Sequence, residues 1–464
     1  MAFDPPPNER PTIRRRESWR RYQRRLRQSD RWRLLRRRWP WLVIPVMGGL
    51  ILWAAATRWP TPAPPTDGPA APLSSAPQDA PLLEKADIRN LLENAPLGKI
   101  LAGPFEVGFG DRRLRVESTI DPDLQAYLQK QLYRRTSRYI AIVVMDSHSG
   151  HVLALVDFAR AGSPSPPSLS NRFPAASLFK IVTAAAAVEK CGYSRSTPLA
   201  YNGASHTLYK SQLKNVRNRY TRHTTLEKAF AGSVNPIFGK IGRHCLGPEK
   251  LRHYADRFGF DQPIAFELAL PPSSTRITDE PYQWAEIACG FNQETVISPL
   301  HGAVMAAVAP AEGRLVEPTI IRRIVDQDGQ LLYRPRAGTG KAAVSPATAR
   351  ELGRMMRRTV SHGTARKIFR RRSKDKVLSR LTIGGKTGSI DTPDHKARCD
   401  WFVGFADGPD PNDAIAVSVL VAHEKYIGRR AGEYARRAVK EYFRRRLERQ
   451  SKEAARRRTT APAT

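Results

Sequence analysis

The sequence predicts an α+β domain in which an antiparallel sheet, built from both ends of the domain, is flanked by helices and carries an all-helical subdomain. Short apolar, β-branched runs occur at residues 139–156 and return only after residue 380. Between them, residues 176–308 have helical periodicity, and strands at both ends with helices between favour one shared sheet. An uncharged stretch at residues 39–57 predicts one transmembrane helix in front of the domain.

The composition limits both the class of protein and its partners. The chain has 464 residues, of which 41% are apolar, which is too many for a disordered chain and too few for a protein with many membrane spans. Lys and Arg number 77 against 43 Asp and Glu, so the formal net charge is +34. A charge of this size favours polyanionic partners such as nucleic acid, anionic lipid or cell-wall polymer.

Much of the charge lies in residues 1–38, which we expect to form an Arg-rich cytoplasmic segment. Residues 39–58 are predicted to be a transmembrane signal anchor, with tryptophans near both ends and the Arg excess holding the N-terminus in the cytoplasm. Because a membrane span follows the basic segment directly, we expect no nucleic-acid partner. A signal peptide cleaved near residues 54–56 and a buried core helix remain alternatives.

The rest of the chain is then expected on the periplasmic or other extracytoplasmic side of the cytoplasmic membrane. Residues 59–82 are rich in Pro and Ala and predict an extended linker. A short segment follows at residues 83–115, with one helix over 84–94. The main domain is predicted over residues 116–443, followed by a basic tail at 444–464.

Local patterns predict the elements of the main domain in order. A helix capped by Thr119 or Asp121 comes first, and turn residues at 146–150 separate the first two strands. Two apolar stripes, at 178–188 and 226–241, predict helices. The remaining expected elements are strands at 380–384, 400–406 and 414–421 and a basic helix from residue 432.

Ser177-Leu-Phe-Lys180 is the first candidate for catalytic chemistry. The three-residue spacing at the start of a helix places a lysine amine on the same face as the serine hydroxyl. The apolar helix that follows can desolvate Lys180, which would lower its pKa and free a neutral amine. The spacing alone is weak evidence, because it recurs in polar, basic stretches at residues 211–214 and 373–376.

Two further groups follow in the chain. Ser233-Val-Asn235 alone could cap or bend a helix, and Lys386-Thr-Gly-Ser389 alone could be an ordinary turn. Together with Ser177 and Lys180 they supply a nucleophile, two amines, a relay hydroxyl, a side-chain amide and a glycine-flanked strand edge for a peptide.

In this order the three motifs resemble Ser-x-x-Lys, Ser-x-Asn and Lys-Thr-Gly of the penicillin-binding protein transpeptidases, which belong to the serine β-lactamase-like superfamily. The resemblance spans about residues 116–443. Its supporting stretches are residues 116–125, 144–154, 363–365 and 401–405. Ser298-Pro-Leu-His301 and Cys289 depart from the usual pattern of the family.

The resemblance implies that Ser177 attacks the carbonyl between two D-alanines of a cell-wall stem peptide, and that Lys180 accepts its proton. Ser233 would relay a proton toward the leaving D-alanine. Lys386 would keep the site positive and hold the Lys180 amine neutral. No metal and no cofactor are expected, and the sequence has no CxxC or HExxH spacing.

The remaining motif residues are implied to bind the acyl donor. Asn235 would hydrogen-bond its backbone amide, and Thr387 and Ser389 would bind its terminal carboxylate. Gly388 would leave room for the peptide along the strand. The backbone N–H groups of Ser177 and Ser389 would form an oxyanion hole.

The expected function is therefore a peptidoglycan D,D-transpeptidase that cross-links stem peptides through a serine acyl-enzyme and is acylated by β-lactams. The segment before the domain is too short for a glycosyltransferase domain, so we expect a monofunctional protein. The open alternatives are a D,D-carboxypeptidase, a class D-like β-lactamase and a non-catalytic β-lactam sensor or scaffold. A glycosyltransferase or another wall-synthesis protein is a candidate partner.

The cysteines and two further basic stretches also carry structural expectations. Cys191 and Cys245 each end a predicted helix, so a disulfide between them is expected, with free thiols as the alternative. The basic stretches at residues 366–376 and 436–458 are either solvated surface or sites of attraction to anionic wall polymer or headgroups.

Overall fold

The computed structural model describes residues 83–163, 165–336, 338, 340–410 and 412–459. The predicted cytoplasmic segment, signal anchor and linker lie outside these ranges. Within them, no helix is both long enough and apolar enough to cross a membrane.

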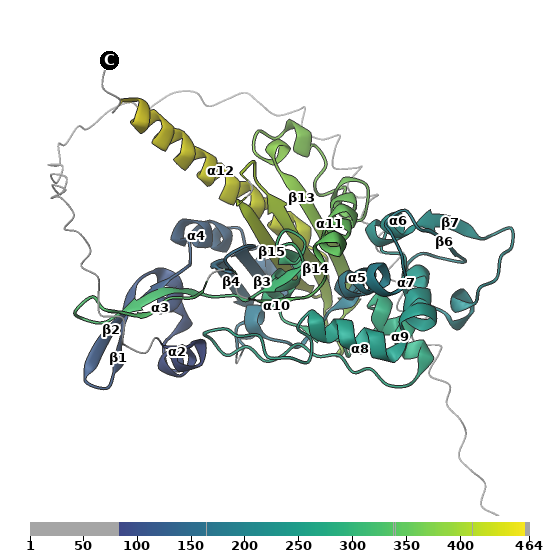
Figure 1. Cartoon of the computed structure of the whole chain (residues 1–464), viewed down its shortest axis with the longest axis horizontal. Helices are drawn as coiled ribbons and strands as arrows, with labels where there is room; N and C mark the ends of the chain where they lie inside the picture. The colour runs from purple at the N-terminus through teal and green to yellow at the C-terminus, as the bar shows by residue number, and fades with distance from the viewer. Residues whose placement is uncertain (1–82, 164, 337, 339, 411, 460–464) are drawn as a thin grey trace, which may run out of the picture. The chain divides into compact units, whose positions relative to one another are not determined.

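The centre of the domain is a five-stranded antiparallel sheet in the order β13-β14-β15-β3-β4 (Figure 1). Two strands come from the first part of the domain, β3 (Ser137–Asp146) and β4 (Val152–Ala159). Three come from its end, β13 (Thr382–Asp391), β14 (Arg398–Asp407) and β15 (Ala414–His423). Since β15 pairs with β3, the expected sheet built from both ends of the domain is confirmed.

Helices cover both faces of this sheet. All of β15 is buried, as expected for a strand covered on both sides. Alternate residues of β3 point into two different hydrophobic cores. Ile140, Ile142 and Val144 belong to the core that includes α4 (Pro122–Lys130) and α12 (Ala431–Thr459). Ala141, Val143 and Met145 belong to the core that includes α5 (Lys180–Lys190), α10 (Pro299–Ala307) and α11 (Pro346–Ser361). The face that carries α5 is the one that forms the candidate site.

The apolar stripe at residues 226–241 belongs to two helices. The structure has α6 (Leu226–Ala231) and α7 (Asn235–Ile241), separated by a turn in which Ser233 has a φ of 54°. Pro236, in the first turn of α7, cannot donate a backbone hydrogen bond to the preceding turn, so a continuous helix is broken here. The break brings Ser233 out of the helical repeat.

The subdomain is also not entirely helical. Its helices include α8 (Gly247–Arg257) and α9 (Pro281–Cys289), but a hairpin of β6 (Pro198–Tyr201) and β7 (Arg222–Thr225) interrupts the helical region. Both strands are short, and β7 is polar, so neither has an alternating apolar pattern that could be read from the sequence. Two other short strands, β5 (Phe173–Pro174) and β8 (Val296–Ile297), pair beside the sheet.

The segment before the predicted main domain folds with it. Helices α2 (Lys85–Leu92) and α3 (Leu97–Ala102) lead into a second sheet in the order β1-β2-β10-β11. Its strands are β1 (Phe105–Phe109), β2 (Arg112–Ser118), β10 (Ile321–Val325) and β11 (Leu331–Tyr333), and a small pair is formed by β9 (Arg314–Val316) and β12 (Gly340–Ala342). Residue 116, the predicted start of the main domain, lies inside β2.

The last helix, α12, continues to Thr459, past the predicted start of the basic tail at residue 444. Arg444 pairs with Glu441 and Glu448, three and four residues away on the same helix face. Pairs at this spacing support a helix whose composition is otherwise strongly basic.

The expected disulfide between Cys191 and Cys245 is present, with 6.2 Å between the two Cα atoms. It joins the end of α5 to the π-helical turn Gly242–Leu246 that follows α7. Cys289 and Cys399 are buried free thiols.

One buried group predicts a loss of stability in acid. His301 of α10 is fully buried, and its Nε2 lies 2.7 Å from the Phe258 carbonyl oxygen, to which it donates. Burial lowers its pKa from 6.5 to about 4. The unfolded chain therefore binds a proton that the folded chain rejects, and the free energy of unfolding should fall by roughly 2–3 kcal/mol between pH 7 and pH 4.5.

Urea denaturation at the two pH values measures this effect. The His301→Gln variant, which keeps a polar side chain but cannot titrate, should lose less stability than the natural protein over the same interval. Equal losses in both proteins would contradict the assignment to His301.

Candidate active site

Ser177 lies in a short 3-10 turn, Ala176–Phe179, directly before α5. Ala176 has a φ of 51°, a backbone region that non-glycine residues rarely adopt and that is often found at functional sites. Gly290 backs onto this turn, and a Cβ atom there would lie 1.8 Å from the Ala176 carbonyl oxygen. Only a glycine at residue 290 therefore lets the end of α9 support the Ser177 turn.

Lys180 is fully buried one helical turn after Ser177. Its Nζ lies 2.8 Å from the Ser177 Oγ and 2.8 Å from the Asn235 Oδ1, and it also donates to the Cys289 carbonyl oxygen. Burial lowers the pKa of Lys180 from 10.5 to about 8. Such an amine is partly neutral near physiological pH, so it can take the proton of the adjacent serine hydroxyl.

A second serine–lysine pair lies beside the first. The Lys386 Nζ donates to the Ser233 Oγ at 3.0 Å and to the Thr387 carbonyl oxygen at 2.9 Å. Lys386 is fully buried, and its pKa lies well below the ordinary value because of burial and the nearby charge of Lys180. Two buried amines so close together disfavour double protonation, which helps to keep one of them neutral.

The third motif lies along β13, which is the edge strand of the central sheet. Lys386, Thr387, Gly388 and Ser389 pair with β14 on one side only, so the other edge is free of sheet partners among the described strands. At Gly388 a Cβ atom would lie 3.2 Å from the Ala176 Cβ, so glycine allows close approach of β13 to the Ser177 turn. An extended peptide can add to such an edge beside the nucleophile.

The structure thus brings all eight residues singled out by the sequence to one place, on α5 and its preceding turn, on the α6–α7 junction and on β13. It also adds residues that sequence reasoning missed. The Thr364 Oγ1 lies 2.6 Å from the Thr387 Oγ1, and the Arg398 Nε donates to the Ser389 Oγ at 2.9 Å. Thr364 lies in the stretch at residues 363–365 that resembles the family, and Arg398 lies in the β13–β14 hairpin, whose register brings it near Ser389.

His206 was also missed, because no motif marks it. It lies in the loop after β6, where its neighbours include the Ser233 backbone, Lys180 and Lys386. Burial and the two lysine charges lower the pKa of His206. The imidazole is therefore a neutral group at the rim of the site near pH 7.

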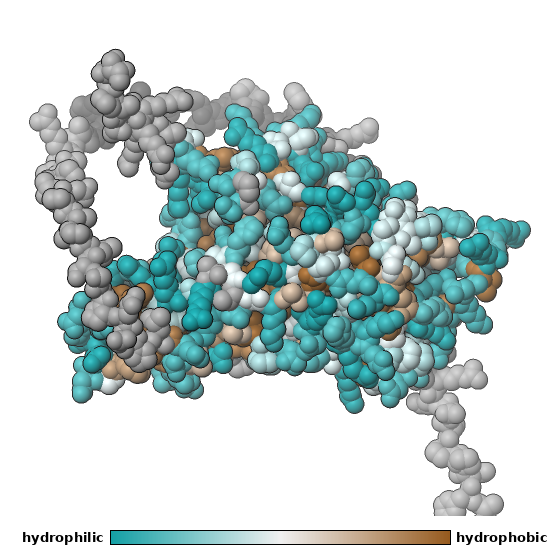
Figure 2. All heavy atoms as spheres, in the orientation of Figure 1, coloured by the Kyte–Doolittle hydropathy of each residue, from teal (hydrophilic) through white to brown (hydrophobic). Residues whose placement is uncertain are grey.

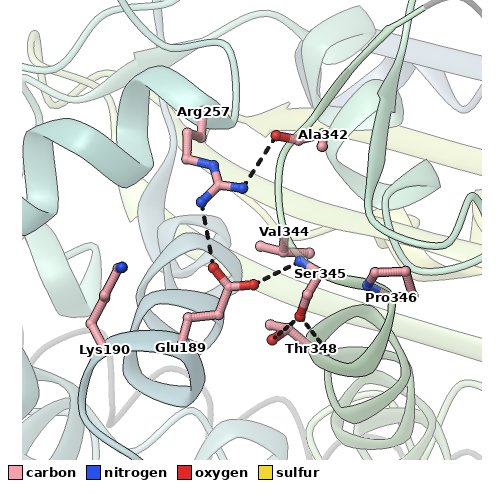
Figure 3. Close-up of a pocket in the computed structure, with 8 residues that line it drawn as sticks. All are labelled: Glu189, Lys190, Arg257, Ala342, Val344, Ser345, Pro346 and Thr348. Atoms are coloured by element: carbon pink, nitrogen blue, oxygen red, sulfur yellow. Dashed lines mark hydrogen bonds and ion pairs between the residues drawn. The ribbon is translucent and has the colours of Figure 1, made fainter.

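A surface hollow elsewhere contains none of these residues (Figure 3). In it, Glu189 accepts hydrogen bonds from the Tyr254 hydroxyl at 2.6 Å and the Ser345 backbone N–H at 2.7 Å, and it pairs with Arg257. The Glu189 carboxylate thus links α5 to α8 and to the start of α11. We assign this hollow a structural role.

Known protein families include one that matches most of this domain. A family model described as the penicillin binding protein transpeptidase domain matches residues 140–444, which include every motif residue above. The chain belongs to this family. The transpeptidase domain therefore accounts for the central sheet, both serine–lysine pairs and the first part of α12.

Two curated relatives of this transpeptidase domain come from Mycolicibacterium smegmatis. The chain is 25% identical over 380 residues to the peptidoglycan D,D-transpeptidase PbpA, covering 73% of this chain and 74% of PbpA. It is 26% identical over 327 residues to the penicillin-binding protein PbpB, covering 65% of this chain. The chain spans only half the length of PbpB, 50%.

Solved structures show the same fold. Penicillin-binding protein A from Mycobacterium tuberculosis, solved as a ceftriaxone acyl-enzyme complex, is similar with a TM-score of 0.56 and 22% sequence identity. The similarity covers 71% of this chain and 79% of that chain.

Proposed function

We propose that this chain is a peptidoglycan D,D-transpeptidase that works through an acyl-enzyme on Ser177 and is acylated by β-lactams. The observation that carries the proposal is the 2.8 Å contact between the buried Lys180 amine and the Ser177 hydroxyl, with the Lys386–Ser233 pair beside it. The relative PbpA is named as a D,D-transpeptidase, and a structural relative forms an acyl-enzyme with ceftriaxone.

In the first step, the neutral Lys180 amine takes the Ser177 proton while the Ser177 Oγ forms a bond to the carbonyl carbon of the D-Ala-D-Ala peptide bond. The negative oxygen that develops is stabilised by the backbone N–H groups of Ser177 and Ser389. The peptide C–N bond then breaks. Ser233 donates its hydroxyl proton to the leaving amine of D-alanine and regains a proton from the one that Lys180 took from Ser177, while Lys386 holds Ser233 through a hydrogen bond.

Other residues of the site hold the acyl donor. Asn235 fixes the Lys180 amine and offers its side-chain amide to the donor backbone. The Thr387 and Ser389 hydroxyls bind the terminal carboxylate, and Gly388 leaves space for the peptide. Arg398, which is paired with Asp391 at 2.8 Å, holds the Ser389 hydroxyl in place through its hydrogen bond.

In the second step, an amine of another stem peptide attacks the ester and is joined to the donor. The same ester attacked by water would make the protein a carboxypeptidase, and rapid hydrolysis of a penicilloyl ester would make it a β-lactamase. The complete set of contacts around Ser177 favours an enzyme over a sensor or a scaffold.

The proposal includes the location of the enzyme. Residues 39–58 anchor it in the cytoplasmic membrane, with residues 1–38 in the cytoplasm and the domain on the other side. The Cys191–Cys245 disulfide supports this, because disulfides persist in oxidising, extracytoplasmic compartments. Stem peptides are the substrates, and a glycosyltransferase that makes glycan strands is the expected partner.

The test is to incubate the detergent-solubilised full chain with a peptide ending in D-Ala-D-Ala and an amine acceptor, and to separate the products. Free D-alanine and the joined peptide are expected in equal amounts, together with a long-lived penicillin adduct. Free D-alanine without the joined peptide would show a carboxypeptidase instead. Consumption of penicillin without a lasting adduct would show a β-lactamase.

A further inference from the structure

We propose that residues 202–221, the basic excursion between β6 and β7, form a docking surface for the acidic part of the peptide substrate. This inference rests on the proposed function, since it concerns the same site. The excursion occupies the outer end of the β6–β7 hairpin in Figure 1.

The basic excursion is continuous with the candidate active site. Its Ser205 carbonyl oxygen accepts a hydrogen bond from the backbone N–H of Asn235 at 2.7 Å. The next residue, His206, lies beside Ser233 and the two buried lysines. A peptide that extends from the Ser177 hydroxyl past Ser233 therefore meets the excursion directly.

A buried glutamine gives the basic excursion a fixed shape. The Gln212 Nε2 donates to the carbonyl oxygens of Asn202 and Ala204 at 3.0 and 3.1 Å. Its Oε1 accepts from the Thr207 hydroxyl and the Tyr209 backbone N–H, both at 3.0 Å. A surface held in this way loses little conformational entropy when a ligand binds.

The outer part of the basic excursion is also fastened. The Asn202 Nδ2 donates to the Val216 carbonyl oxygen at 2.8 Å, and the Thr221 hydroxyl donates to the Asn202 Oδ1 at 2.9 Å. Asn202, directly after β6, therefore holds the last part of the excursion close to its start.

The basic excursion carries positive charge without compensating carboxylates. No Asp or Glu occurs from residue 202 to residue 225. The exposed cations are Lys210, Lys214, Arg217 and Arg219, and within the described part of the chain none of them pairs with a carboxylate. Nearby Arg195 and Arg358, by contrast, both pair with Glu227. Lys210 lies over the Tyr282 ring and Arg219 over the Tyr220 ring, and neither contact neutralises the positive charge. Cations without carboxylate partners attract an anionic substrate.

Exposed apolar side chains alternate with these cations, which favours a peptide over a simple anion. Tyr209, Val216 and Tyr220 are each at least half exposed, at 51%, 52% and 66%. Figure 2 shows hydrophilic residues predominating over the β6–β7 end of this face, with a small hydrophobic group among them. Together with the free edge of β13, this surface fits an extended chain with carboxylate side chains.

The experiment compares two donor peptides ending in D-Ala-D-Ala, one with internal glutamates and one with glutamines at the same positions. The natural full chain should have a higher kcat/KM for the glutamate donor at low salt, and the preference should disappear at high salt. Replacing Lys214, Arg217 and Arg219 together with serine should lower kcat/KM for the glutamate donor by about tenfold. Penicillin acylation and the glutamine donor should change little.

The control variant removes the same charge at the second sheet, with Arg112→Ser in β2, Arg322→Ser in β10 and Arg334→Ser directly after β11. It should keep the preference for the glutamate donor. Loss of the preference in the control as well, or no preference in the natural protein, would overturn the inference. If the excursion variant instead lost only its binding to anionic lipid vesicles, the surface would serve a membrane and not a peptide.

Failure of the proposed function gives a different pattern. In that case the natural protein would neither form a penicillin adduct nor release D-alanine from either donor. A normal adduct with no effect of donor charge would overturn the docking surface alone.

Discussion

Replacing Ser177 with alanine is expected to abolish covalent labelling by a fluorescent penicillin. The Ser177 Oγ is the atom that would form the ester, and the Lys180 amine beside it has no other hydroxyl within the contacts of the site. Loss of a nucleophile lowers acyl-transfer rates by about a millionfold in well-studied serine hydrolases. Denaturing electrophoresis followed by mass mapping of the labelled peptide measures the effect.

The chain offers a matched control for this change. Ser373 has a lysine three residues later, as Ser177 does, but it is exposed and lies far from α5 in the sequence. The Ser373→Ala variant should label like the natural protein. A stable adduct on the Ser177→Ala variant, at any residue, would move the nucleophile elsewhere.

Replacing Lys180 with alanine is expected to slow acylation by about 10²–10⁴-fold, the usual contribution of a general base. In the natural protein the acylation rate should rise with pH up to about 8, because only the neutral form of the amine accepts the serine proton. The variant should lose this rise as well as the rate. Stopped-flow measurement of penicillin acylation across the pH range provides both readings.

Lys190, at the exposed end of the same helix, serves as the control. The Lys190→Ala variant should keep the rate and the pH profile, since its side chain has no contact with Ser177. An unchanged rate in the Lys180→Ala variant would assign the base to another group, for which the buried amine of Lys386 is a candidate.

The sequence predicted the central sheet because its strands are apolar on both faces and cannot be mistaken for loops. It predicted the motif residues because three short patterns occur in a fixed order. It placed the strand at residues 380–384 too short, since the Lys-Thr-Gly-Ser stretch has low strand propensity and is held in β13 by pairing with β14.

Other features depend on tertiary structure and could not be predicted. Pro236 accounts for a break between α6 and α7, but the positive φ of Ser233 itself is not encoded in helix propensity. The contacts of Thr364 and His206 join separate segments of the chain, and no catalytic motif marks them. These residues complete the site through packing and not through a motif.

The disulfide has one more consequence. Cys191 and Cys245 enclose a stretch that includes the exposed basic excursion and the second serine. A protease cut within the excursion would place Ser177 and Lys180 on one fragment and Ser233 and Lys386 on the other, yet the fragments would stay covalently joined. The nicked protein would then persist as a two-chain enzyme, which only a reducing agent could separate.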